Sequence, residues 1–191
     1  MKMHIGLAGY ARSGKDTFAA RLTERHGFHR VAFADPVREA ILRLNPLVDT
    51  GTAFGPARVA DLIDMGGWEH AKTYPDVRQL LQRMGTEVGR EMFGATFWVD
   101  QALAIASRHE RVVYTDCRFP SEADAVRHGG GLIIWVSRPG VNALNQHPSE
   151  SSLNDYPFDH MVVNDGTIDD LAVVADLLVA DLSQRTRGHA A

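Results

Sequence analysis

The start of the sequence constrains the fold more than any other part. A short apolar run at residues 4–8 leads directly into residues 9–17, which read GYARSGKDT. A glycine, four further residues and then Gly-Lys form the pattern of a loop that wraps phosphate groups, because glycines permit the tight backbone path and the lysine reaches the phosphates. Such a loop works between a strand and the N-terminus of a helix, where backbone N–H groups face the anion. The pattern therefore predicts a strand, a loop and a helix in that order, and with them an α/β fold.

Asp16 stands where such loops usually carry a serine or threonine whose hydroxyl binds magnesium. Magnesium prefers oxygen ligands and often takes one or two carboxylates together with water, so a carboxylate could replace that hydroxyl directly or through water. Thr17 supplies a hydroxyl one position later, which could contact the α-phosphate. The alternative is that Asp16 only complements the positive end of the helix dipole.

Short apolar runs alternate with helical patterns along the rest of the chain. Runs of four to six residues that are rich in β-branched side chains and bounded by Gly, Asp or Pro favour strands. The strands that we expect are residues 4–8, 30–34, 111–115, 132–136 and 160–163. The helices that we expect are residues 14–26, 36–43, 76–92, 95–109 and 120–127, and a last helix that opens at Thr167. Asp35 is the expected N-cap of the second helix, and Thr167 with Asp170 resembles a capping box.

Strands that are apolar throughout indicate a parallel sheet buried on both faces. The order of the elements is that of a doubly wound α/β sheet with a helical insertion between Asp35 and Val112. Ligands on such sheets bind beyond the carboxyl ends of the strands. The segments that follow the first four expected strands are residues 9–17, 35–39, 116–122 and 138–140, and each carries charged side chains. This convergence predicts a binding site at that edge of the sheet.

The composition excludes several classes of protein. The 191 residues carry a formal net charge of -4, so no overall positive field attracts a nucleic-acid polymer. Cys117 is the only cysteine, which excludes a disulfide framework and favours a reducing, cytoplasmic setting. No apolar run approaches the ~20 residues of a membrane helix, and we expect no signal peptide at the N-terminus.

Five segments together resemble phage deoxynucleoside monophosphate kinases. They read GKDT in the loop, LLQRMGTEVGR in the insertion, DCRFPSEADAV after the third expected strand, and HPSES and NDGTIDDL near the end. They occur in order along nearly the whole chain, and the combination is much more specific than the loop alone. Gly-Lys-Asp-Thr is similar to the loop of that family, so Asp16 is no defect by this comparison.

The resemblance implies a fold and a domain plan. The fold would be the three-layer α/β/α fold of P-loop NTPases, with a five-stranded, mainly parallel sheet and a helical insertion that binds the nucleoside monophosphate. One kinase domain would cover residues 1–191, with its core at 1–35 and 110–185, the insertion at about 36–109 and a lid-like loop at about 138–152.

The resemblance also implies an activity. It is the transfer of the ATP γ-phosphoryl group to a deoxynucleoside monophosphate with the help of Mg2+, which needs positioning and charge neutralisation more than covalent chemistry. The partners would be these two nucleotides, with no membrane and no nucleic-acid polymer. The expected location is the cytoplasm of an infected bacterium, and the expected assembly includes a homodimer.

The donor side of the site follows from the loop and from two later strand ends. The residues expected to bind ATP are Gly9, Ala11, Arg12, Ser13, Gly14, Lys15, Asp16 and Thr17, with Mg2+ on Asp16. Asp116 would hold magnesium through water or orient an arginine, or else cap the turn that follows it. Arg118 would bridge the donor and acceptor phosphates, and Arg138 would stabilise the transferred group from the lid. The alternative for each arginine is that it lies on the solvent-exposed surface and takes no part in the site.

The acceptor side is expected in the insertion. Arg38 would hold the acceptor phosphate with Asp35 orienting it, unless Asp35 only caps its helix. Gln79, Arg83, Thr86 and Arg90 form a polar stripe on the long expected helix. On this helix we expect Gln82 to read a base edge near Thr86, and Arg90 to bind phosphate, the alternative being a solvated polar face. Trp98 would stack on the base or lie in the core, and by resemblance Glu122 belongs to the acceptor side of the active site.

Two other functions remain open from the sequence. One is a small-molecule kinase of the same fold, similar to dephospho-coenzyme-A or phosphomevalonate kinase, against which the Gln and Arg of LLQRMGTEVGR argue. The other is a phosphate-loop module that binds ATP without catalysis, against which the arginines after several strands argue. His147, Ser149 and Glu150 suggest neither a metal site nor a catalytic triad, because no second histidine or elbow motif accompanies them.

Overall fold

The computed structural model describes residues 2–142 and 152–188. The chain divides into two compact units. The sheet unit comprises residues 1–32 and 103–191, and the helical unit comprises residues 33–102. The helical unit is thus inserted between the two parts of the sheet unit, at residues 33–102, whereas the sequence patterns predict the insertion at about 36–109.

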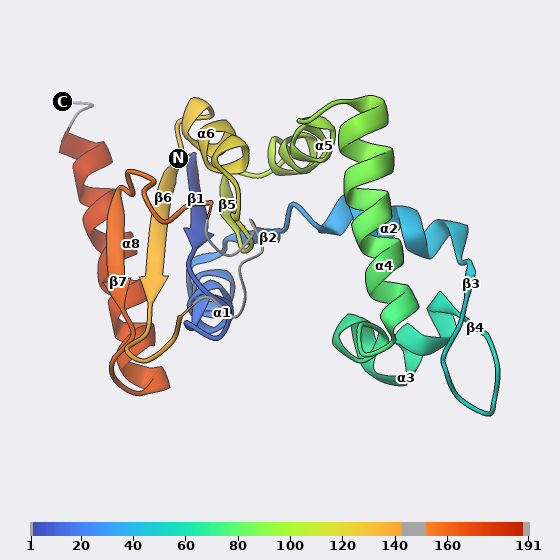
Figure 1. The fold of residues 1–191 in the computed structure, drawn as a ribbon. Helices are drawn as coiled ribbons and strands as arrows, with labels where there is room; N and C mark the ends of the chain where they lie inside the picture. The colour runs from blue at the N-terminus through green and yellow to red at the C-terminus, as the bar shows by residue number, and fades with distance from the viewer. Residues whose placement is uncertain (1, 143–151, 189–191) are drawn as a thin grey trace. The chain divides into compact units, whose positions relative to one another are not determined.

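The sheet unit is built on one five-stranded sheet in which every neighbouring pair of strands is parallel. Its strands are β1 (Met3–Ala8), β2 (His29–Val31), β5 (Arg111–Tyr114), β6 (Leu132–Ser137) and β7 (His160–Val163). They lie in the order β2-β5-β1-β6-β7 (Figure 1). Every residue of β1 is buried, because this central strand is covered on both faces. The predicted α/β fold class is confirmed.

Helices cover the two faces of this sheet (Figure 1). On one face, α1 (Lys15–His26) and α8 (Ile168–Gly188) pack together and bury apolar side chains against β1, β5, β6 and β7. On the other face, α6 (Pro120–His128) packs on β1 and β6. The backbone of Gly6 lies so close to this layer that a Cβ there would come within 2.8 Å of the Cys117 sulfur. The result is the predicted three-layer arrangement.

A charged cluster joins α1 to α8. Asp176 on α8 accepts hydrogen bonds from Arg21 at 2.9 and 2.5 Å and from His26 at 2.7 Å. The hydrogen bonds from Arg21 and then from His26 hold the pKa of the Asp176 carboxyl well below its usual range. The helix after the first strand and the helix after the last strand are therefore joined by hydrogen-bonded charged side chains as well as by the apolar core.

The helical unit has its own small core. Its elements are α2 (Asp35–Leu44), β3 (Leu47–Val48), β4 (Ala57–Arg58), α3 (Val59–Ala71), α4 (Pro75–Arg83), a π-helix η1 (Met84–Phe93) and the first part of α5 (Phe97–Ala106). β3 and β4 form a short antiparallel pair. The buried core residues are Val37, Ile41, Val48, Val59, Leu62, Ala71, Val77 and Trp98.

The single long helix predicted at residues 76–92 is in fact α4 followed by the π-helix η1. Trp98 explains the change. A Cβ at Gly89 would lie 1.8 Å from the indole Nε1 of Trp98, so only glycine leaves room for this ring. The indole N–H donates to the carbonyl of Gly85 at 3.0 Å. A wider helical turn lets the backbone meet the ring, as π-bulges often do at special contacts.

Three further points compare the predicted helices and helix caps with those of the structure. Helix α2 begins at Asp35 with Ala34 as its N-cap, so the prediction that Asp35 is the N-cap is wrong. Helix α3 has no counterpart among the predicted helices, because Gly66 and Gly67 interrupt its pattern with non-helical backbone angles. The capping box at the last helix is confirmed: Thr167 N–H donates to Asp170 Oδ2 at 2.9 Å, and Asp170 N–H donates to Thr167 Oγ1 at 3.2 Å.

Within residues 2–142 and 152–188, no helix is both long and apolar enough to cross a membrane.

Candidate functional site

The loop after β1 has the backbone that a phosphate cradle needs. Gly9, Arg12 and Gly14 all have positive φ angles, of 135°, 66° and 106°. Glycine is required at position 9, because a Cβ there would lie 2.1 Å from the carbonyl oxygen of Val136. Gly14 is the N-cap of α1 and contributes no side-chain cap to the helix. A glycine N-cap leaves this helix end without a side chain in front of its backbone N–H groups, and the positive end of the helix dipole there favours an anion.

Lys15 lies across this loop. Its Nζ donates to the carbonyl oxygens of Gly9 at 2.7 Å and Tyr10 at 2.6 Å. The ammonium group is thereby held at the loop by two backbone acceptors of the loop itself. A phosphate oxygen, which carries a full negative charge, is a stronger partner for an ammonium group than a neutral carbonyl. The arrangement suits a lysine that turns from the loop to an anionic ligand.

Asp16 shares a pocket with the end of β5. The pocket has a volume of about 460 Å³ and is lined by Asp16, Ala19, Ala20, Thr23, Phe28, His29, Arg30 and Thr115. Asp16 lies in the first turn of α1 and is exposed, and Thr115 immediately precedes Asp116. Among the described residues no cluster of three or more His, Cys, Asp or Glu side chains could hold a metal ion by itself. Asp16 is the only carboxylate among these lining residues, which fits a magnesium ion that takes its other ligands from phosphate and water.

The segment after β5 is fixed by backbone contacts. Thr115 N–H donates to Val31 O at 3.0 Å, and Cys117 N–H donates to Leu7 O at 3.1 Å, so the segment is bound to β2 and to β1, the strands on either side of β5. Asp116 is half-buried and Arg118 is exposed. Cys117 points into the protein, where burial raises the pKa of its thiol. This alternation presents Asp116 and Arg118 on the side away from the core.

Glu122 is buried and bound to backbone N–H groups, which is not the environment expected of a residue that contacts substrate. Its side chain is 4% exposed, and its Oε2 accepts hydrogen bonds from the backbone N–H groups of Arg118 at 2.8 Å and Phe119 at 3.1 Å. The carboxylate thus closes the turn that carries Arg118 and caps the start of α6. This geometry favours a residue that positions Arg118 over one that binds the nucleotide itself.

Arg138 follows the last residue of β6 and is exposed, and its carbonyl accepts a hydrogen bond from Val141 N–H at 3.0 Å. It lies at the carboxyl edge of the sheet, as do the loop and Asp116. The lid-like loop predicted at about 138–152 falls mostly on residues 143–151, which lie outside the described residues together with His147, Ser149 and Glu150.

In the helical unit, Asp35 and Arg38 lie together on the first turns of α2. Arg38 Nη1 is 3.4 Å from Asp35 Oδ1, and its guanidinium carbon lies 6.0 Å from the centroid of the Trp68 ring. The carboxylate and the ring therefore hold the guanidinium from two sides. This contact supports the expectation that Asp35 orients Arg38.

Gln82 lies on α4, and Thr86 and Arg90 lie on η1. Gln82 and Thr86 are exposed, and Arg90 is half-buried. Their spacing of four residues keeps them on one side of the helix, since α- and π-turns both contain close to four residues. The structure therefore groups these three predicted residues within the helical unit.

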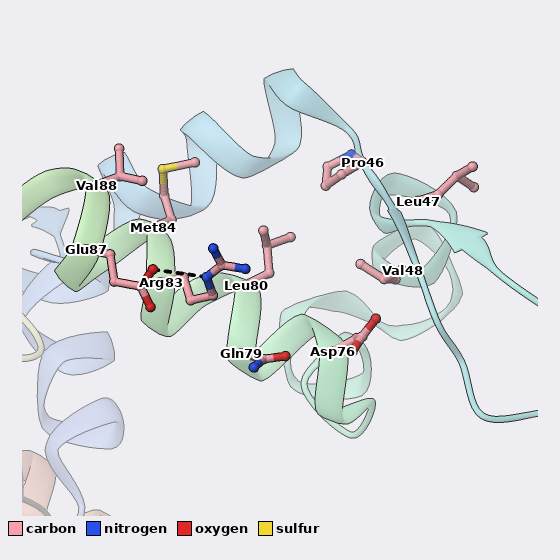
Figure 2. Close-up of a pocket in the computed structure, with 10 residues that line it drawn as sticks. All are labelled: Pro46, Leu47, Val48, Asp76, Gln79, Leu80, Arg83, Met84, Glu87 and Val88. Atoms are coloured by element: carbon pink, nitrogen blue, oxygen red, sulfur yellow. Dashed lines mark hydrogen bonds and ion pairs between the residues drawn. The ribbon is translucent and has the colours of Figure 1, made fainter.

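Figure 2 shows a pocket on another side of the same helix, with a volume of about 330 Å³. It is lined by Pro46, Leu47, Val48, Asp76, Gln79, Leu80, Arg83, Met84, Glu87 and Val88. Arg83 Nε donates to Glu87 Oε2 at 3.1 Å along its wall. Gln82, Thr86 and Arg90 do not line it. The pocket could have been anticipated only from the polar stripe through Gln79 and Arg83, since the chain that forms its other wall comes from β3.

Trp98 belongs to the core of the helical unit. It is 9% exposed, packs on Gly89 and donates its indole N–H to Gly85 O. These contacts favour the core alternative for this residue over stacking on a base. Asn164, which sequence reasoning did not single out, contacts the phosphate-binding pattern directly: its Nδ2 donates to Ser13 O at 2.9 Å.

A parallel sheet with a glycine-lysine loop between its first strand and the following helix is the arrangement of α/β proteins that bind phosphate groups. Comparisons with known proteins name the family. The family model of deoxynucleotide monophosphate kinases matches residues 63–174. A protein of Acanthamoeba polyphaga mimivirus, provisionally named for the same family, is 32% identical over 188 residues, which cover 87% of this chain and 90% of that protein. The chain therefore belongs to the deoxynucleotide monophosphate kinase family, and the recognition made from the sequence is confirmed.

Two other comparisons carry less weight, one because it covers half of the chain and the other because its sequence identity is low. The deoxynucleotide monophosphate kinase of Enterobacteria phage T4 is 31% identical over 100 residues, which cover 50% of this chain and 42% of the phage protein. Among solved structures, a dephospho-CoA kinase from Campylobacter jejuni covers 97% of this chain and 100% of its own, with 14% identity and a TM-score of 0.48. The family assignment therefore rests on the sequence comparisons.

Proposed function

We propose that the protein transfers the γ-phosphoryl group of ATP to a deoxynucleoside 5'-monophosphate and depends on Mg2+. The observation that carries the proposal is the loop between β1 and α1, with its positive φ angles at Gly9, Arg12 and Gly14 and with the Nζ of Lys15 at the carbonyl oxygens of Gly9 and Tyr10. Family membership supports the choice of acceptor.

The donor triphosphate would lie on this loop, with Lys15 on its β- and γ-phosphates. An oxygen of the acceptor phosphate attacks the γ-phosphorus, the bond from that phosphorus to the β–γ bridging oxygen breaks, and ADP leaves with the electron pair. Asp16 and Asp116 would hold Mg2+, which when bound neutralises charge between the phosphates. Arg118, held by the turn that Glu122 closes, would stabilise the transferring group together with Arg138.

The acceptor would bind to the helical unit. Arg38, oriented by Asp35 and by the Trp68 ring, and Arg90 suit its phosphate, because guanidinium groups bind phosphate oxygens in pairs. Gln82 and Thr86 suit the base and sugar. The phage and viral relatives support a role in the cytoplasm of an infected cell, and a homodimer is the assembly that we expect there.

The test is a coupled assay of ADP release with ATP and Mg2+ against all common deoxynucleoside and ribonucleoside monophosphates, with dephospho-CoA and phosphomevalonate as further acceptors. We expect turnover on a subset of the deoxynucleotides. Gln82→Ala should change the ranking of bases while Gln79→Ala, on the side shown in Figure 2, should not. ATP binding without turnover on any acceptor would contradict the proposal and favour a binding module.

A further inference from the structure

Asn164 is a buried polar residue at the start of the segment NDGTIDDL, directly after β7. It is 6% exposed. Its backbone N–H donates to the carbonyl of Ser137, the last residue of β6, at 2.8 Å. Its position is therefore set by the sheet itself, at the carboxyl edge where the phosphate loop also lies.

The side chain of Asn164 reaches a peptide of the phosphate loop. Its Nδ2 donates to the carbonyl oxygen of Ser13 at 2.9 Å, between residues that are 151 positions apart in the sequence. A trans peptide is planar, and its C=O and N–H groups point in opposite directions. No peptide bond in the described part of the chain is cis. A Ser13 carbonyl that points toward Asn164 therefore turns the N–H of Gly14 away from the buried side, which is the direction an anion on the loop requires.

The amide of Asn164 is matched to a glycine at the next position. An ideal Cβ on Gly14 would lie 2.5 Å from Asn164 Nδ2 and 3.1 Å from Leu171 Cδ2. Any side chain at Gly14 would displace the amide, and the φ of 106° would be strained for it as well. Gly14 thus serves two purposes: it permits the turn, and it lets the last strand contact the loop.

Ser13 cannot hold the same peptide with its own side chain. Its hydroxyl oxygen is buried and has no hydrogen-bond partner among the described residues. Ser13 N–H donates to Tyr10 O at 3.2 Å, a longer contact on the preceding peptide. The hydrogen bond from Asn164 Nδ2 to Ser13 O is therefore the contact described here that fixes the orientation of the Ser13–Gly14 peptide.

We propose that Asn164 is a positioning residue for phosphoryl donor binding, which holds the Ser13–Gly14 peptide with its N–H turned toward the donor phosphates. The inference rests on the proposed function of the loop. A hydrogen-bond donor, here the Gly14 N–H, that is fixed before the ligand arrives needs no reorganisation on binding. It therefore strengthens binding of the ligand and stabilises the transition state. Asn164 contributes to the donor side and leaves acceptor binding unaffected.

The experiment compares Asn164→Ala and Asn164→Asp with Ser137→Ala as a matched control. Ser137 lies at the same sheet edge, and its hydroxyl donates to Val162 O at 3.3 Å; within residues 2–142 and 152–188 this hydroxyl has no hydrogen bond to the phosphate loop. The probes are inorganic pyrophosphate, which has no base, and ADP, each titrated by calorimetry with Mg2+. We expect Asn164→Ala to lower the affinities for pyrophosphate and for ADP by roughly tenfold, because the variant loses one hydrogen bond and the ordering of the loop that this bond provides. Asn164→Asp should weaken both further, because its carboxylate faces a carbonyl oxygen and the phosphates.

In turnover, KM for ATP should rise in both Asn164 variants while KM for the acceptor stays within about twofold of wild type. A merely structural role would change both KM values or neither, and Ser137→Ala should change neither. Pyrophosphate and ADP affinities equal to those of wild type, in variants whose melting temperature is unchanged, would overturn the proposal.

If both Asn164 variants fail to fold, the wild-type chain provides the test. In an NMR titration with pyrophosphate, the Gly14 amide should shift strongly, and the Asn164 side-chain amide protons should exchange slowly before and after the addition. Fast exchange of these protons would overturn the proposal. Absence of turnover on every acceptor with intact pyrophosphate binding would instead contradict only the proposed function, and absence of pyrophosphate binding to wild type would overturn both.

Discussion

The loop of the sheet unit and the helix formed by α4 and η1, on which we propose that the acceptor binds and which we call the acceptor helix, are built on different principles. In the loop, backbone groups carry the geometry: glycines at 9 and 14, the carbonyls that hold Lys15, and the strand ends on either side. On α4 and η1 the proposed binding groups are side chains, and the buried ring of Trp98 packs where the helix widens. Backbone geometry is set by a few residues with strong local preferences, whereas side chains on a helix depend on what packs behind them.

This difference suggests a division of labour. A backbone cradle can bind the phosphates that all nucleoside triphosphates share, because it offers N–H groups and little else. Side chains on a helix can distinguish one base from another. Substitutions in the loop should therefore affect every substrate alike, and substitutions on the acceptor helix should affect substrates unequally.

The largest effect is expected at Lys15. Lys15→Ala should lower kcat by at least about three decades on all acceptors, since it removes the positive charge on the donor phosphates. The fold should persist, because the Nζ of Lys15 donates to carbonyl oxygens of the loop, those of Gly9 and Tyr10. A coupled assay and a thermal melt measure the two expectations, and full activity in this variant would contradict the assignment of the loop.

Arg118 should come next. Arg118→Ala should lower kcat by two decades or more, which corresponds to about 3 kcal/mol of transition-state stabilisation. The turn that carries it should be retained, because Glu122 binds the backbone of residue 118 and not its side chain. Single-turnover kinetics would separate this loss from slower product release. An unchanged kcat would show that the site does not include this arginine.

Asp16 should have a smaller, metal-dependent effect. Asp16→Asn should raise the Mg2+ concentration needed for half-maximal activity by about tenfold, because it removes one anionic oxygen from the magnesium site. The measurement is a magnesium titration at saturating nucleotide. Titration curves that coincide with wild type would leave Asp16 with the helix dipole as its only role.

Two glycines test how far Trp98 shapes the acceptor helix. Gly89→Ala should lower the stability of the helical unit by about 1–3 kcal/mol, because its Cβ would overlap the indole of Trp98. Gly85→Ala is the matched control on the same π-helix, since a Cβ there meets no heavy atom within 4 Å. Thermal melts of the two variants should differ clearly. Equal melting temperatures would contradict the proposed cause of the π-helix.

The smallest expected effect is the pH dependence of the α1–α8 contact. The pKa of Asp176 is lowered by Arg21 first and by His26 second, so its contribution to stability is present above the carboxyl's usual value of 3.8 and is lost as the pH falls below it. Asp176→Asn should therefore melt at a lower temperature than wild type at pH 7, and the two should converge towards pH 2. A difference that stays constant with pH would exclude this ionic origin.

The sheet unit could largely be predicted from the sequence, and the reasons are local. β-branched apolar runs between Gly, Asp and Pro located all five strands, and Thr167 with Asp170 marked the start of α8. The expected second strand ran to residue 34, whereas β2 ends at Val31 because α2 begins at Asp35. Such end positions depend on the neighbouring element, which a local pattern does not contain.

The contacts that position the site could not be predicted, because they join residues far apart in the sequence. The Asn164 amide on the Ser13 carbonyl spans 151 positions, and the Trp98 indole on Gly85 spans 13. Glu122 is closer to its partners, but nothing in DCRFPSE tells a carboxylate that binds backbone N–H groups from one that binds a substrate. Burial and hydrogen-bond partners decide these roles, and both are properties of the folded chain.

The most direct measurement is transfer of label from ATP that carries 32P at its γ-phosphate to each of the four deoxynucleoside monophosphates, with the products separated by chromatography. We predict label in the deoxynucleoside diphosphate of at least one base, dependent on Mg2+ and absent in Lys15→Ala. Label only in inorganic phosphate, or label retained in ATP with every acceptor, would contradict the conclusion that this loop and these arginines form a monophosphate kinase.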